Sequence, residues 1–248
     1  MLDLNSLLGF VSESVTAPIN SPAIMASGNV HSFNMAQKLP WYKEFLNHAD
    51  IIRLDGAGVA WAVRILGYKP PQRSTWADFG WPLLEMCAEK GFKVFFFGCA
   101  PGIAEQARKE CVTRYNTLQI VGTEHGFINW GDPVSEDNRQ LIERINSSKA
   151  DILIIGLGMP RQEQWILDHR DDLQVKIIMT GGAVFNYLAG TEKRAPQWML
   201  NSGLEWFFRF LLEPHRLWKR YILGNPLFII RVVKEVFVRR VFNRKAGR

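Results

Sequence analysis

The sequence has few cysteines and no long apolar run, and each absence excludes a class of protein. Its 248 residues contain three cysteines, Cys87, Cys99 and Cys111, spaced twelve residues apart without a CxxC pair. This spacing indicates neither a zinc site nor a redox motif, so we expect small buried hydrophobic side chains. No stretch reaches the roughly 18–20 apolar residues that a spanning helix needs. The N-terminus lacks the basic and apolar regions of a signal peptide.

Motifs of several common enzyme classes are also missing. The sequence has no GxGxxG fingerprint and no Walker phosphate loop, which disfavours dinucleotide oxidoreductases and P-loop NTPases. It has no GxSxG nucleophile elbow. The five histidines show no metal-ligand spacing, and no Asp-x-Asp pair is present to hold a divalent metal against a nucleotide diphosphate. We therefore expect no metal and no cofactor, so that arginine, lysine and backbone amides must bind any phosphate groups.

Charge is distributed unevenly along the chain. Residues 194–248 carry a net charge of +9, whereas residues 1–193 carry −3. We therefore divide the sequence into a mildly acidic body, 1–193, and a basic aromatic appendage, 194–248. Such an appendage points to an anionic partner, which is a membrane surface, nucleic acid or phosphate groups.

Short apolar runs alternate with helical patterns throughout the body. The runs predict strands at 23–26, 51–54, 93–97, 118–121, 151–155 and 175–179. The stretches between them predict helices at 31–39, 41–47, 59–66, 80–89, 103–115 and 135–147, and another that begins near Gln162. This alternation predicts an α/β, Rossmann-like fold, a mostly parallel sheet with helices on both faces.

One carboxylate occupies the end of a predicted strand. Asp55 follows the run 51–54, and Gly56 and Gly58 then lead into an apolar helix. Open α/β sheets bind their ligands at this edge, which makes Asp55 a candidate catalytic residue. The alternative is that Asp55 only caps the helix. Other predicted strands end in glycines whose backbone amides can approach a phosphate closely, namely Gly98, Gly156, Gly158, Gly181 and Gly182.

The appendage is rich in aromatic and basic residues. From Leu227 onward apolar residues recur at helical spacing, at Ile229, Ile230, Val233, Val236, Phe237 and Val241. A basic helix of this kind favours the interface of a membrane. The alternative is that its apolar face packs on the body or on a second subunit. We expect Asn225-Pro226 to break the pattern into two segments. Nucleic acid is disfavoured, since no known binding module is visible.

Five stretches together resemble one family, the WecG/TagA/CpsF glycosyltransferases (glycosyltransferase family 26). They run in the family's order between residues 22 and 222, as ADIIRLDGAGVAW, KVFFFGCAPGIAEQA, ADILIIGLGMPRQEQWI, TGGAVFNYLAGTEKRAPQWM and GLEWFFRFLLEPHRLWKRY. The resemblance implies inverting, metal-independent transfer of a sugar from a UDP-sugar to a polyprenyl-diphosphate-linked sugar. It also implies a role in bacterial surface polysaccharide or exopolysaccharide assembly, at the cytoplasmic face of the inner membrane.

The resemblance also assigns roles to residues. It makes Asp55 the general base, with Ser27 and Asn29 beside the acceptor. The expected donor-binding residues are Gly98, Phe127, Gly156, Gly158, Gln162, Gly181, Gly182 and Asn186. The expected acceptor-diphosphate residues are Arg73, Arg209, Arg216, Lys219 and Arg220.

Four positions depart from the family's usual residues. Ser27 replaces Thr, Trp76 replaces Gly, Phe127 replaces Tyr and Asn186 replaces Asp. Phe127 and Asn186 lie near the expected nucleotide pocket, and their changes leave the identity of the sugar open. The sequence does not name the acceptor sugar either. A rival interpretation from another class is a non-catalytic, membrane-associated scaffold that binds nucleotide sugars or anionic lipid. Turnover that depends on Asp55 would distinguish an enzyme from it.

Overall fold

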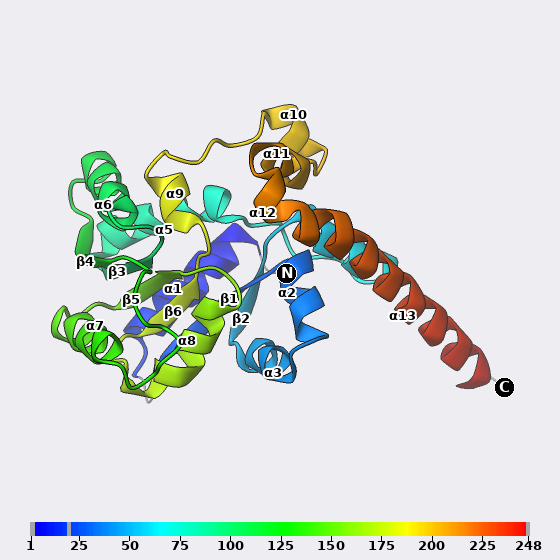
Figure 1. Cartoon of the computed structure of the whole chain (residues 1–248), viewed down its shortest axis with the longest axis horizontal. Helices are drawn as coiled ribbons and strands as arrows, with labels where there is room; N and C mark the ends of the chain where they lie inside the picture. The colour runs from blue at the N-terminus through cyan, green and yellow to red at the C-terminus, as the bar shows by residue number, and fades with distance from the viewer. Residues whose placement is uncertain (1–2, 19–20, 247–248) are drawn as a thin grey trace.

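A single parallel sheet forms the centre of the molecule (Figure 1). The computed structural model describes residues 3–18 and 21–246, without the side chains of residues 201 and 240–246. The strands pair in the order β2-β1-β6-β5-β3-β4, all parallel. They are β1 (Ala23–Gly28), β2 (Ile51–Leu54), β3 (Lys93–Gly98), β4 (Gln119–Glu124), β5 (Ile152–Gly156) and β6 (Ile177–Thr180). The predicted fold class is confirmed.

Helices cover both faces of the sheet. One layer comprises α1 (Leu4–Thr16), α5 (Trp76–Lys90), α6 (Ile103–Arg114) and α9 (Val184–Leu188). The other comprises α2 (Val30–Ala36), α3 (Pro40–His48), α7 (Glu136–Ser147) and α8 (Arg161–His169). A short 3-10 turn, η1 (Arg170–Asp172), follows α8.

Alternate side chains along each strand enter opposite cores. On β3, Val94 and Phe96 pack with the α1 layer, whereas Phe95 and Phe97 pack with the α3 layer. This is the two-residue period of a strand buried on both faces. It explains why the central strands read as continuous apolar runs in the sequence.

Several element boundaries differ from the predicted ones. Strand β4 continues to Glu124 rather than ending at residue 121, because Gly122 leaves room for the ring of Phe95, which a Cβ would approach to 2.3 Å. Helix α5 begins at Trp76 rather than at residue 80, directly after Thr75, whose backbone is extended. The Trp76 side chain is buried there and its indole N–H donates to the Thr180 carbonyl (2.9 Å), so the first turn belongs to the core.

The predicted break at Asn225-Pro226 is wrong. Helix α12 (Pro214–Trp218), a π-helical turn η2 (Lys219–Leu223) and α13 (Gly224–Ala246) follow one another without an irregular residue. Pro226 occupies the first turn of α13, where a missing backbone N–H is tolerated. Two short helices, α10 (Gln197–Asn201) and α11 (Glu205–Leu212), precede them.

Helix α13 packs on the body along one face. Phe228 and Val232 are buried against Val59 of α4 (Ala57–Ile65). Asn34 of α2 donates to the Gly224 carbonyl (2.8 Å) and accepts from Arg231 (2.6 Å). The alternative that the appendage packs on the body is therefore confirmed for this face.

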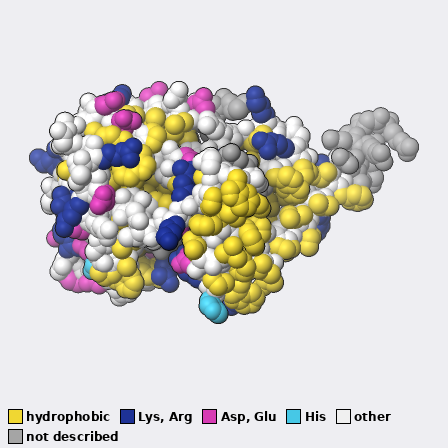
Figure 2. Space-filling view, turned by 90° about the horizontal axis from the view of Figure 1, so that it is seen from above, with side chains coloured by type: hydrophobic (Ala, Val, Ile, Leu, Met, Phe, Trp, Pro, Cys, Tyr) yellow, Lys and Arg dark blue, Asp and Glu magenta, His cyan; other side chains and the backbone are white. Residues whose placement is uncertain are grey.

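Several other apolar side chains of α13 face solvent, and the helix projects away from the body (Figure 1). The exposed ones include Ile229, Ile230, Val233 and Phe237, whereas the side chain of Val241 lies outside the described part of the chain. In Figure 2, hydrophobic side chains gather on the side from which α13 projects. None of the described helices combines the length and apolar character needed to cross a bilayer.

Candidate active site

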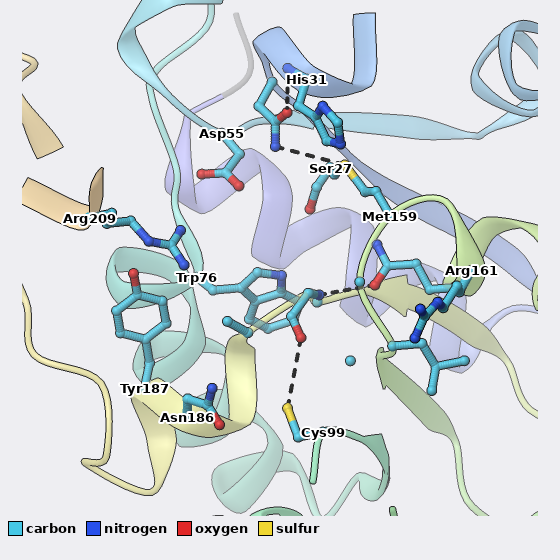
Figure 3. Close-up of a pocket in the computed structure, with 18 of the residues that line it drawn as sticks. Ser27, His31, Asp55, Trp76, Cys99, Met159, Arg161, Asn186, Tyr187 and Arg209 are labelled. Carbon is cyan, nitrogen blue, oxygen red and sulfur yellow. Dashed lines mark hydrogen bonds between the residues drawn. The ribbon is translucent and has the colours of Figure 1, made fainter. Parts of the chain in front are cut away.

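A cavity of about 670 Å³ opens at the carboxyl edge of the sheet (Figure 3). Residues that follow every strand line it, and basic residues of the appendage close one side. It contains the predicted residues Ser27, Asn29, Asp55, Phe127, Gly156, Gly158, Gln162, Gly181, Gly182, Asn186, Arg209, Arg216, Lys219 and Arg220. The fold therefore brings together most of the predicted site.

The Asp55 carboxylate points into this cavity, between Arg209 and Ser27 in the view of Figure 3. Its backbone N–H donates to the Gly28 carbonyl (2.9 Å), which fixes the turn after β2. The N-cap of α4 is Gly56, whose φ of +111° favours glycine, and no side chain caps this helix. Within the described residues the carboxylate accepts no hydrogen bond. The capping interpretation of Asp55 is therefore wrong.

A fully buried arginine lies two residues before Asp55. Arg53 donates to the Ser27 hydroxyl (2.8 Å) and to the Ser74 carbonyl, and its guanidinium stacks 4.9 Å from the Trp76 ring. Burial lowers the pKa of Arg53 to about 10, against the opposing charge of Asp55. Arg53 thus remains charged at neutral pH, near the candidate base. Sequence reasoning missed it, although a charged residue inside a buried apolar run was a usable signal.

Ser27 and Asn29 have structural partners as well as a place in the cavity wall. The Ser27 hydroxyl donates to the Thr180 carbonyl (3.0 Å). The Asn29 side-chain oxygen accepts from the N–H groups of His31 and Ser32 (3.0 Å each) and caps α2. Its amide nitrogen lies 4.0 Å from the Met159 sulfur. We expect that amide to be the group that Asn29 can offer to a ligand.

Gln162 connects the cavity to a buried carboxyl. Its side-chain oxygen accepts the Gly182 N–H (3.1 Å), and its amide donates to Glu163 (2.7 Å). The second Glu163 oxygen and the Tyr42 hydroxyl are both buried without a hydrogen-bond partner among the described residues. Burial raises the pKa of Glu163 to about 7, although the bond from Gln162 opposes this. Glu163 thereby holds the amide of Gln162 in one orientation.

This buried carboxyl predicts a pH dependence of stability. Between about pH 4.5 and 7, Glu163 is ionised in the unfolded chain but protonated in the fold, so the free energy of unfolding falls as pH rises and then levels off. The free energy of unfolding should fall by about 3 kcal/mol at most across this pH range because of Glu163. We expect Glu163→Gln to remove this part of the slope in urea denaturation at pH 5 and pH 8. Glu143→Gln, at an exposed site on α7, should retain it. An unchanged slope in Glu163→Gln would contradict the assignment.

Close packing of the backbone requires glycine at two strand ends. A Cβ on Gly156 would lie 2.9 Å from the Gly182 carbonyl oxygen and 3.0 Å from the Phe185 ring, so this close approach needs a residue without a side chain at position 156. Gly98 packs in the same way against Gly156, and Cys99, the next residue, forms the cavity wall. Burial raises the pKa of Cys99 to about 11, which keeps this half-buried thiol protonated.

The predicted basic residues divide between two cavities. A second cavity, of about 710 Å³, lies between α4 and the appendage and is lined by Arg73. Arg216 and Lys219 line the first cavity, whereas Arg209 and Arg220 line both. Six residues line both cavities, and all are polar: Asn29, His31, Asp55, Glu205, Arg209 and Arg220.

Carboxylates of the protein pair with three of these arginines. Arg209 contacts Glu192 (2.7 Å), Arg73 contacts Glu205 (3.4 Å), and Arg216 contacts Glu213. Burial disfavours the charged form of Arg209, but Tyr187 and Glu192 outweigh it and raise its pKa. The Nε of Arg209 is buried and has no hydrogen-bond partner among the described residues.

Sequence reasoning missed two polar residues at the boundary of the cavities. Burial, with help from Arg220, lowers the pKa of His31 to about 4, so His31 is neutral at pH 7. Burial also raises the pKa of Glu205. Glu205 stands in the stretch GLEWFFRF, in which the resemblance assigns a role only to the basic residue. No group of three metal-ligating side chains occurs among the described residues.

Comparisons with known proteins agree with the arrangement of the cavity. The model of the glycosyl transferase WecG/TagA/CpsF family matches residues 1–241. The chain belongs to this family. It is therefore a glycosyltransferase, and the predicted family and enzyme class are confirmed.

Two of its relatives are named N-acetylglucosaminyldiphosphoundecaprenol N-acetyl-beta-D-mannosaminyltransferase. The one from Bacillus spizizenii is 28% identical over 233 residues, which are 93% of this chain and 87% of the relative. The one from Staphylococcus aureus is 28% identical over 212 residues, which are 85% and 79% respectively. Both names place their acceptor on a polyprenyl diphosphate.

Proposed function

We propose that this glycosyltransferase moves a hexose or N-acetylhexosamine, with inversion, from a UDP-sugar to N-acetylglucosamine on a polyprenyl diphosphate. The position of Asp55 carries the proposal: its free carboxylate lies on the boundary of two cavities. A donor in the first and an acceptor in the second would meet there. The names of the relatives support N-acetylmannosamine as the first donor to test.

In the proposed reaction Asp55 is the general base. Its carboxylate takes the proton of the acceptor hydroxyl while that oxygen forms a bond to the anomeric carbon of the donor. The bond from the anomeric carbon to the diphosphate oxygen breaks, and UDP leaves as an anion. Attack on the face opposite the leaving group inverts the anomeric centre.

Charged and amide groups of the first cavity would stabilise the departing UDP. Arg216 and Lys219 line only that cavity, and Arg209 and Arg220 reach both. Fixed cations and backbone N–H groups act strongly in a site that excludes water. Arg73 lines only the second cavity, which supports a role for it at the acceptor diphosphate.

The function is tested with a panel of UDP-sugars and N-acetylglucosamine-diphosphate acceptors that carry a short prenyl chain. We expect one UDP-sugar to yield UDP and a disaccharide-diphosphate lipid, detected by mass spectrometry. The anomeric configuration of the product, measured by NMR, should be inverted. Hydrolysis of UDP-sugar without transfer, or retention of configuration, would contradict the proposal.

Metal independence is a second expected outcome. Protein cations and amides take the part that a divalent ion plays in other nucleotide-sugar enzymes, so EDTA should leave the initial rate within about two-fold of the untreated enzyme. The measurement compares EDTA alone with EDTA plus excess magnesium or manganese. Strong inhibition that either metal reverses would show a metal requirement.

We further propose that the enzyme is peripheral, at the cytoplasmic face of the inner membrane. The acceptor lipid stays in the bilayer, and the exposed apolar side chains of α13 lie beside Lys234 and Arg239. A helix with this arrangement favours the membrane interface. A homo-oligomer is also compatible with these exposed side chains.

A further inference from the structure

The second cavity has two chemically different parts. The residues that it shares with the first cavity are polar, whereas most residues that it alone contains are apolar. The apolar wall combines Trp61 of α4 and Trp206 of α11 with residues of η2 and of the start of α13, namely Tyr221, Ile222, Phe228 and Ile229. The rings of Trp206 and Tyr221 pack at an angle of 59°, with their centroids 5.7 Å apart. A ligand that fills this cavity therefore needs a polar group at Asp55 and an apolar group beyond it.

Glycines form part of the wall of the apolar region. Gly56 and Gly203 both have positive φ, of +111° and +72°. A Cβ on Gly56 would meet no atom within 4 Å, so backbone alone faces the cavity there. Large apolar residues from two helices line it and are half-exposed, with Trp61 of α4 40% and Ile229 of α13 45% accessible. Covering such side chains with an apolar ligand removes apolar surface from water, which makes the free energy of binding more favourable.

An apolar track continues from the cavity along α13. Ile229, Val233 and Phe237 recur every four residues, so they lie on one face of the helix. All three are exposed, and Phe237 is 68% accessible. The track thus runs from the cavity wall to the far part of the helix.

The polar part offers three guanidinium groups to a diphosphate. Arg73, Arg209 and Arg220 line it beside two carboxylates, Asp55 and Glu205, and Arg209 is already paired with a carboxylate outside the cavity. Glu205 already contacts Arg73 at 3.4 Å, so a diphosphate there would exchange one anionic partner for another.

We propose that the second cavity binds the first isoprene units of the lipid acceptor, between Trp61 and Ile229, with the chain leaving along Ile229, Val233 and Phe237. This inference rests on the proposed function, since it assigns the lipid chain of that acceptor to a site of its own. A hydrocarbon chain attached to a diphosphate matches both parts of the cavity. Trp61 and Ile229 are then specificity residues for the lipid, remote from the reacting atoms.

The test compares two acceptors in solution, N-acetylglucosamine diphosphate linked to farnesyl or to methyl. We expect the wild-type kcat/KM to be at least ten-fold higher for the farnesyl acceptor. Trp61→Ala and Ile229→Ser should bring this ratio close to one. Matched controls on the same helices, Ile65→Ser and Ile230→Ser, change exposed apolar residues that do not line the cavity and should keep the wild-type ratio. A wild-type ratio near one, or a ratio unchanged in both cavity variants, would overturn the proposal.

A binding measurement separates this inference from the proposed reaction. Farnesyl diphosphate and methyl diphosphate are titrated by calorimetry without donor. We expect the wild type to bind farnesyl diphosphate at least ten-fold more tightly, and Trp61→Ala to lose that difference. If no UDP-sugar is turned over but this preference is found, the proposed function fails and the lipid site stands. Equal binding of the two ligands would overturn the lipid site whatever the turnover.

Discussion

Asp55→Asn is expected to lower turnover by at least ~10²-fold, the usual loss when a general base is removed. The substituted amide keeps the size of the side chain but accepts no proton. Because the Asp55 carboxylate accepts no hydrogen bond within the described residues, the fold should keep its native circular dichroism. Initial rates with saturating donor and a soluble acceptor give the measurement.

The control for this variant is Asp171→Asn, at an exposed carboxylate in η1 that lies outside both cavities. It should keep wild-type turnover. If Asp55→Asn also stays within a few-fold of the wild type, another group takes the proton. Glu205, which lines both cavities, would then be the next candidate.

The double variant Val233→Asp/Phe237→Asp is expected to lose binding to anionic liposomes by at least ten-fold. Burying each of these side chains in a membrane interface is worth about 1.5–3 kcal/mol, and the new carboxylates are repelled by anionic lipid. Co-sedimentation with liposomes gives the measurement. Raised salt should weaken wild-type binding in part, since only the basic residues are screened.

Val134→Asp is the matched control, since Val134 is exposed on the body far from α13 in sequence. It should bind liposomes like the wild type. Point variants are preferable to removal of residues 194–248, because removal would uncover Val59 and Leu54, which pack against Phe228 and Val232. Liposome binding by the double variant equal to that of the wild type would show that α13 is not the anchor.

Local sequence patterns were sufficient for the sheet and for the loops that carry the site. The run 51–54 and the run from Ile152 are rich in β-branched residues, and both form strands there. Asp55 and Gly156 then reach the same cavity because parallel strands end at one edge. The resemblance added the basic residues of the appendage, which no strand pattern would bring to that edge.

Features that depend on distant contacts were not predictable in this way. Strand β4 continues through Gly122 because a glycine there leaves room for the Phe95 ring of the neighbouring strand. Helix α5 begins at Trp76, whose indole N–H donates to the distant Thr180 carbonyl. The Asn225-Pro226 pair looked like a break because local rules do not foresee a π-helical turn directly before it. Trp61 shows only helical spacing in the sequence, and its place in the second cavity follows from the docking of α13.

The unbroken path from α12 through η2 to α13 has a consequence for how the two substrates arrive. At about 1.5 Å per residue, the 17 steps from Arg220 to Phe237 span roughly 25 Å without an irregular residue. Attachment of this rod to a bilayer would therefore orient both cavities together. In that orientation a lipid could enter and leave by lateral diffusion within the leaflet, while the nucleotide sugar exchanges with water through the other cavity. Catalysis would then take place where two phases meet, and the acceptor would not have to leave the membrane.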